Sequence, residues 1–237
     1  MLTALNAFVA TFAGYGNPTA PLWFVGMEEG GGESVDELSR RVQAWDARGR
    51  RTLEDLPSYH HAIGLARNFV PPFPLQRTWA PLLRLLLAKR GEQITPARLK
   101  QAQSADLGTT GGDTALVELF PLPAHNTGAW PYASLAAQLP SLVDRDTHAS
   151  TMMAPRVHLL QRLIASAKPE AVVSYELSDL LTWKMIVAAA LPPTELLGRR
   201  YHAARVGRTT FLAVPHPVAR GTTKEFWEGV GRLLRSA

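Results

Sequence analysis

Four short apolar runs, spaced along the chain, limit its fold more than any other feature of the sequence. They are built from Val, Leu, Ala and aromatic residues, and each ends at, or is followed by, a Gly, a Pro or a polar residue. Runs of this kind are typical of strands that are buried on both faces of a parallel sheet. The four runs are Pro21–Gly26, Ala115–Phe120, Ala171–Tyr175 and Thr209–Pro215.

Helical patterns fill the intervals between these runs. Ser34-Val-Asp-Glu37 and Thr222-Thr-Lys-Glu225 have the pattern of a capping box, and each precedes apolar residues at helical spacing. Further helices are predicted from Thr78 to Arg90, over Met152–Ala167 with Pro155 in the first turn, and over Ser178–Ala190. Alternating strands and helices predict right-handed crossovers, and hence a three-layer α/β/α sandwich around a four-stranded parallel sheet. Because no linker or repeat is visible, we expect one domain over residues 1–237.

Composition excludes several classes of protein. The chain has 237 residues, of which 46% are hydrophobic and 19% charged, as in ordinary globular proteins. It contains no cysteine, which excludes disulfides, thiolate zinc sites and iron–sulfur clusters. No apolar run approaches the roughly 18 residues that span a bilayer, and residues 1–13 lack the basic start and cleavage site of a signal peptide. We therefore expect a cytoplasmic protein without membrane contact.

The charge balance suggests a class of partner. The net charge is +5, and clustered arginines carry the excess. Such a balance suits phosphate-rich partners, because each neutralised phosphate releases counterions. A solvated surface without a partner is the alternative, and composition does not decide between them. The clusters are Arg40/Arg41, Arg48/Arg50/Arg51, Lys89/Arg90, Arg199/Arg200 and Arg205/Arg208.

Ligands of open parallel sheets bind at the carboxyl ends of the strands, so the residues after each run are candidate site residues. The first run is followed by Gly26-Met-Glu-Glu-Gly-Gly-Gly-Glu33. The loop does not match a phosphate cradle, because the spacing fits no phosphate fingerprint, no lysine follows and three carboxylates would repel the anion. A catalytic turn that presents Glu28 or Glu29 as a general base is one interpretation. A structural turn with solvated glutamates is the other.

Two further runs are followed by groups that suit catalysis or binding. His216 lies between Pro215 and Pro217, so its backbone is held rigidly and its imidazole could stabilise a developing anion. A satisfied structural histidine is the alternative. Glu118 lies inside the second run, where a carboxyl group is costly unless it is paired or functional. The alternative for Glu118 is a strand edge at which it meets an arginine.

Metal ligands are not evident. His60 and His61 are adjacent in the long first crossover, but no acidic or histidine partner lies at ligand spacing. We expect this pair on the surface or in a loop, and we expect neither a metal nor another cofactor.

Together these residues resemble the motif pair of the uracil-DNA glycosylase superfamily. In Trp23–Gly30, Glu28 stands at the position where an Asp or Asn of the family usually holds the attacking water, and Gly26-Met27 is similar to the single-strand-selective branch. In Val214–Val218, His216 matches the histidine that stabilises the departing uracil oxyanion. The segment Leu116–Trp130 resembles the second-strand region, where an Asn normally reads the uracil edge. The resemblance covers most of residues 20–237.

The chain also departs from the family pattern. Glu118 stands where the uracil-reading Asn should be, Glu29 replaces a proline, and Val218 replaces the common serine after His-Pro. An ionised Glu118 would accept hydrogen bonds but donate none, so it should prefer an exocyclic amine to the uracil O4. The loop Val218–Thr223, which wedges into the duplex in the family, has no large apolar residue here. The absent cysteines exclude the iron–sulfur branches.

The resemblance implies a monomeric DNA glycosylase that flips a modified or deaminated base and hydrolyses its N-glycosidic bond, as in base-excision repair. Glu28 and His216 would be catalytic, and Arg220 and Lys224 would hold the DNA backbone. One alternative is a nucleic-acid binding module that keeps the scaffold without the chemistry. Another is a metal-assisted hydrolase, in which Glu28, Glu29, Glu118 and His216 hold one divalent cation. The residues that the resemblance assigns to substrate binding are Gly26, Met27, Glu29, Gly30, Glu118, Phe120 and Asn126.

Overall fold

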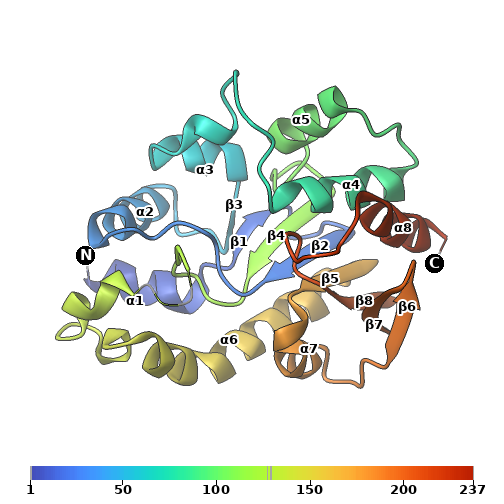
Figure 1. Cartoon of the computed structure of the whole chain (residues 1–237). Coiled ribbons are helices and arrows are strands. Elements are labelled where there is room, and N and C mark those ends of the chain that lie inside the picture. Colours follow the sequence, from blue (N-terminus) through green and yellow to red (C-terminus); the bar gives the residue numbers. More distant parts are fainter. Residues whose placement is uncertain (1, 127, 129, 237) are drawn as a thin grey trace.

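One mixed sheet organises the molecule (Figure 1). The computed structural model describes residues 2–126, 128 and 130–236. Among these, eight strands pair in the order β3-β1-β4-β2-β5-β8-β7-β6. Their bounds are β1 Gly14–Gly16, β2 Leu22–Gly26, β3 Leu53–Glu54, β4 Thr114–Glu118, β5 Ala171–Tyr175, β6 Pro193–Leu196, β7 Arg199–Val206 and β8 Thr209–Val214.

The predicted α/β class is confirmed, but the sheet is larger than predicted. The four apolar runs form β4, β2, β5 and β8, which lie side by side and are mutually parallel. They are the centre of the sheet and not its whole width. On one side β1 pairs antiparallel with β4 and parallel with β3, and on the other side β7 and β6 add an antiparallel hairpin. The prediction of a four-stranded sheet is therefore wrong in extent.

Two hydrophobic cores lie on the two faces of the sheet. Along β2, Leu22 and Phe24 point into one core, whereas Trp23 and Val25 point into the other. This alternation follows from the two-residue repeat of a strand, and it explains why a centrally placed strand is apolar throughout. Helices α2, α4, α5 and α8 pack on the first face, and α6 and α7 pack on the second (Figure 1).

The five predicted helices, α2, α4, α6, α7 and α8, lie where they were expected, with differences at their ends, whereas α1, α3 and α5 were not predicted. Ser34 caps α2 by accepting a hydrogen bond from the Glu37 amide, as predicted. Gln76, and not Thr78, accepts from the first amide of α4, and Thr223, not Thr222, caps α8. The eight helices of the described residues are α1 Leu2–Thr11, α2 Val35–Ala47, α3 Leu56–Ala62, α4 Trp79–Arg90, α5 Pro96–Ala105, α6 Arg145–Ala167, α7 Leu180–Val187 and α8 Lys224–Arg235.

The largest difference concerns α6. It begins at Arg145, where Asp144 caps it, and Pro155 therefore lies inside the helix and not in its first turn. The extra turns extend α6 past the carboxyl ends of the central strands (Figure 1), where Arg145 and His148 join the candidate site. No helix in the described part of the chain is long and apolar enough to cross a membrane.

Candidate active site

A cleft opens at the carboxyl ends of the four central strands, where the sequence predicts a ligand site. It consists of two adjoining cavities of about 620 Å³ and about 440 Å³. Glu28 after β2, Tyr175 at the end of β5 and His216 after β8 line both cavities. Residues that are far apart in the sequence therefore meet because their parallel strands end side by side.

Glu28 is half-buried and stands between the two cavities. Its carboxylate is paired with the guanidinium of Arg145 at the start of α6. This ion pair is the one hydrogen-bonded contact of the Glu28 side chain with described residues, and Glu28 lines both cavities. Glu28 is thus available to a water molecule or a substrate.

Glu29 has the opposite surroundings, although it is the next residue. Its carboxylate accepts hydrogen bonds from Tyr15 Oη at 2.6 Å and from Arg41 Nη1 at 2.9 Å, and it lies 3.1 Å from Nε2 of His60. Burial alone would raise the pKa of Glu29, but the Arg41 charge and the hydrogen bonds from His60 and Tyr15 hold it well below its usual range. Glu29 is a structural anion, and Glu28 is therefore the candidate catalytic carboxylate.

The network around Glu29 also explains two other parts of the sequence. His60 is buried, so its predicted surface position is wrong. Of this pair, His61 is the exposed residue. Arg41 is shared between Glu29 and Glu37, whose other oxygen accepts from the amides of Gly32 and Glu33. The glycine-rich loop is thus folded onto α2, which favours the structural interpretation for its second half.

Glu118 faces the larger cavity, so the alternative of a strand edge at which it meets an arginine is wrong. It is 6% exposed, no arginine side chain pairs with it, and its Oε2 has no partner among the described residues. Its Oε1 lies 3.5 Å from Tyr175 Oη. Burial and the nearby Glu29 charge raise the pKa of Glu118 well above its usual value. The raised pKa favours the uncharged carboxyl group, whereas the preference for an exocyclic amine was derived for the ionised form.

Gly26 permits this arrangement. A Cβ atom at Gly26 would collide with the Tyr175 hydroxyl and with the Glu118 carboxyl group, so only glycine lets both lie against the end of β2. Arg156 of α6 supports the same corner, because its buried guanidinium donates to the backbone carbonyls of Glu118 and Leu119 at 3.0 and 2.6 Å. The position of Glu118 is thus fixed from both faces of the sheet.

His216 is oriented as a hydrogen-bond donor. Its Nδ1 accepts from the Val218 amide at 3.3 Å, and its ring lies edge-on to Tyr175 with the centroids 5.9 Å apart. Burial lowers the pKa of His216, against an opposing effect of Glu176, so the ring is neutral near pH 7. Because Nδ1 is the acceptor, the proton is on Nε2, which has no partner among the described residues.

The smaller cavity contains two residues that the sequence did not indicate. Arg145 and His148 lie one turn apart on α6, ahead of the predicted start of that helix. His148 is 2% exposed, neither ring nitrogen has a hydrogen-bond partner among the described residues, and its ring contacts Phe120 and Trp130. Burial and the charges of Arg156 and Arg145 lower its pKa to about 4.

Most of the predicted binding residues line this cleft, but the two predicted backbone contacts do not. Met27 and Phe120 line the smaller cavity, whereas Gly30 and Asn126 line the larger one. Arg220 is exposed beyond both, and Lys224 lines a separate cavity beside α8. Thr127 of the same predicted region lies outside the described residues.

The metal-binding arrangement is not found. Within residues 2–126, 128 and 130–236, no group of three or more His, Asp or Glu side chains is placed to hold an ion. Glu29 is directed toward Arg41 and His60, and Glu28 toward Arg145, so the four predicted ligands do not converge on one point.

Comparison with known proteins adds no relative: no protein-family model matches the chain, and no curated protein matches it.

Proposed function

We propose that this protein is a DNA glycosylase with a uracil-DNA glycosylase-like fold, and that it hydrolyses the N-glycosidic bond of a flipped base. The observation that carries the proposal is that Glu28 and His216 face one cleft that also contains the buried Glu118 carboxyl group, whose pKa is raised. A carboxylate and a neutral imidazole in one cleft can act on opposite sides of a glycosidic bond.

The proposed reaction assigns one role to each of these groups. The bond between C1′ and the base nitrogen breaks, and its electron pair leaves with the base. His216 stabilises the resulting anion by donating from Nε2 to a base oxygen. Glu28 stabilises the positive charge on the sugar and accepts a proton from the water that forms the new C1′–O bond. For this step Glu28 must exchange its contact with Arg145 for one with water.

Glu118 suggests the class of base. A protonated carboxyl group has one O–H donor and one carbonyl acceptor, the same pair that an amide side chain offers. It therefore suits a base edge with a carbonyl next to a ring N–H, as in uracil, hypoxanthine and xanthine. This replaces the preference for an exocyclic amine that an ionised Glu118 would have.

Labelled oligonucleotides test the proposal. Single and double strands that carry uracil, hypoxanthine, xanthine or a mismatch are incubated with the protein in EDTA and then treated with alkali, which cleaves abasic sites. We expect cleavage at a base that has a carbonyl next to a ring N–H, and loss of cleavage in Glu28→Gln and His216→Ala. Glu195→Gln is the matched control, because Glu195 is an exposed carboxylate on β6, away from the cleft.

The second candidate function is a non-catalytic nucleic-acid binding module. The Glu28–Arg145 ion pair favours it, because Glu28 is neutralised in the free protein. Salt-sensitive binding of every oligonucleotide, without cleavage of any of them, is the outcome that this alternative predicts. Cleavage that requires a divalent cation would instead restore the metal-assisted hydrolase.

A further inference from the structure

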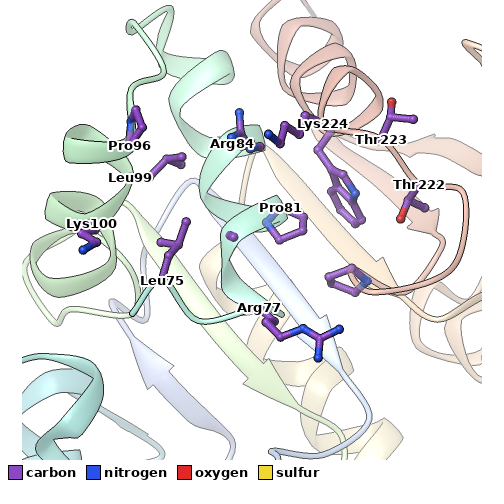
Figure 2. Close-up of a pocket in the computed structure, with 13 residues that line it drawn as sticks. Leu75, Arg77, Pro81, Arg84, Pro96, Leu99, Lys100, Thr222, Thr223 and Lys224 are labelled. Carbon is purple, nitrogen blue, oxygen red and sulfur yellow. The ribbon is translucent and has the colours of Figure 1, made fainter. Parts of the chain in front are cut away.

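A separate cavity lies beside the candidate active site, between α4, α5 and the start of α8. Its volume is about 420 Å³. Figure 2 shows where its cations come from: Arg84 belongs to α4, Lys100 to α5 and Lys224 to the start of α8, and Arg77 lies just before α4. We refer to this cavity as the α4/α8 groove. None of the residues that the resemblance assigned to the base lines it.

The groove is positively charged, and part of that charge is uncompensated. Arg77, Lys100 and Lys224 are exposed and form no ion pair with any described residue, although the charges of Lys224 and Arg84 both help to lower the pKa of Glu225 at the start of α8. Arg84 is different, because it donates to Glu228 of α8 at 2.7 Å. No Asp or Glu lines the groove. Unpaired cations that converge on one cavity from different elements indicate an anionic ligand.

A buried indole that lines the groove is a second, independent observation. Trp227 lines it, is 1% exposed, and its indole N–H has no acceptor among the described residues. A buried donor without a partner is rare in folded proteins and calls for a ligand or a water molecule. The rest of the wall combines apolar residues such as Leu75, Pro81 and Leu99 with the hydroxyl residues Thr222 and Thr223.

The position of the groove relates it to the active site. Pro217 lines the groove, while the preceding residue, His216, lines both cavities of the cleft. A strand whose reacting nucleotide is held at His216 would therefore place a neighbouring part of its backbone at the groove after crossing the loop from Pro217 to Thr223. The charge at the groove is opposite to that of the backbone.

We propose that the α4/α8 groove binds the phosphodiester backbone of the DNA strand next to the excised base, with Arg77 and Lys224 as its principal contacts. This inference rests on the proposed function, because it names the part of the same substrate that lies outside the cleft. It also replaces Arg220 with Arg77 as the cation that acts together with Lys224. Arg84 contributes less, since Glu228 already compensates its charge.

The test measures binding and not excision. The Glu28→Gln protein is titrated with a labelled single-stranded oligonucleotide, and fluorescence anisotropy gives the Kd between about 50 and 200 mM salt. In this background Arg77→Ala/Lys224→Ala should weaken binding about tenfold or more at the lower salt concentration. It should also reduce the slope of log affinity against log salt by about 1.4, which is about 0.7 for each of the two phosphate contacts that the variant loses.

The matched control is Arg51→Ala/Arg162→Ala, which removes two exposed arginines from the loop before β3 and from α6. If this pair lowers affinity and slope as much as the groove pair, or the groove pair changes neither, the groove does not bind the backbone. Thermal melting of both double variants shows that the fold is kept. An excision assay separates the two proposals: binding through the groove without excision by the wild type would refute the proposed function alone.

Discussion

Two carboxyl groups in the larger cavity, Glu29 and Glu118, illustrate how differently one cleft can treat the same chemical group. Glu29 is surrounded by Arg41, His60 and Tyr15 and remains an anion. Among the described residues Glu118 has one long contact, with Tyr175, and burial raises its pKa well above the usual value. A buried anion that is fully paired holds the cleft together, whereas an unpaired neutral group keeps unused hydrogen-bonding capacity for a ligand. Variants at and around both residues can test this division between a paired structural anion and an unpaired ligand-binding group.

The largest expected effect concerns the Glu29 region. Arg41→Met would leave Glu29 and Glu37 without their shared cation, and breaking a buried pair in this way costs about 3–5 kcal/mol of unfolding free energy. Denaturant unfolding measures the loss. Arg50→Met is the control, because its ion pair with Asp46 is exposed and should contribute less than about 1 kcal/mol. Equal losses in the two variants would mean that the buried network is no more important than a surface pair.

The next effect is on rate and not on stability. If Glu28 is the carboxylate that acts on water, Glu28→Gln should slow single-turnover excision about 100- to 1,000-fold, while the unfolding free energy changes by less than about 1 kcal/mol. Glu29→Gln should instead clearly lower the unfolding free energy, because it removes the anion of the buried network. Excision that survives in Glu28→Gln would exclude Glu28 as the working carboxylate.

The sequence predicted the parts of this molecule that depend on local patterns. The four central strands were recognisable because both of their faces are buried, which makes Trp23 and Val25 as apolar as Leu22 and Phe24. The outer strands β1 and β3 were not, because they have three and two residues and show no repeat. Glu28 and His216 could be proposed because strands of a parallel sheet end at a common edge.

Tertiary contacts decided the rest. Nothing local distinguishes Glu28 from Glu29, since the difference lies in Arg41 and His60 on other elements. Arg145 and His148 were missed because Pro155 resembled the first turn of a helix, although Asp144 is the actual cap. The raised pKa of Glu118 depends on its burial and on the nearby Glu29 charge, with no arginine paired to it among the described residues although the sequence contains many arginines. Such absences are visible only in three dimensions.

His148 allows the comparison to be extended to a buried base. Its pKa of about 4 lies below the ordinary value near 6.5, so the folded protein binds fewer protons than the unfolded chain between these two values. Stability should therefore fall as the pH drops from about 6.5 toward 4, by about 2 kcal/mol at pH 5. His148→Phe should flatten this part of the pH profile of unfolding. An unchanged profile would show that His148 is protonated in the folded state or does not titrate in this range.

The smallest effect on excision, and the sharpest test of the division, is expected for Glu118→Gln. Because the pKa of Glu118 is raised in the folded state, the stability that this group provides below about pH 4.3 is lost as the pH rises through the raised value. Glutamine cannot ionise, so the stability of the variant relative to the wild type should rise with pH above about 4.3, which denaturant unfolding at several pH values measures.

The same variant should keep excision within a few-fold, because an amide offers the donor and acceptor that the neutral carboxyl group offers. Glu118→Leu is its counterpart, since it removes both groups at similar size and should abolish selectivity among bases. If Glu118→Gln instead loses excision and stability together at neutral pH, then Glu118 works as an anion. In that case the two carboxyl groups of the cleft differ in their partners and not in their charge.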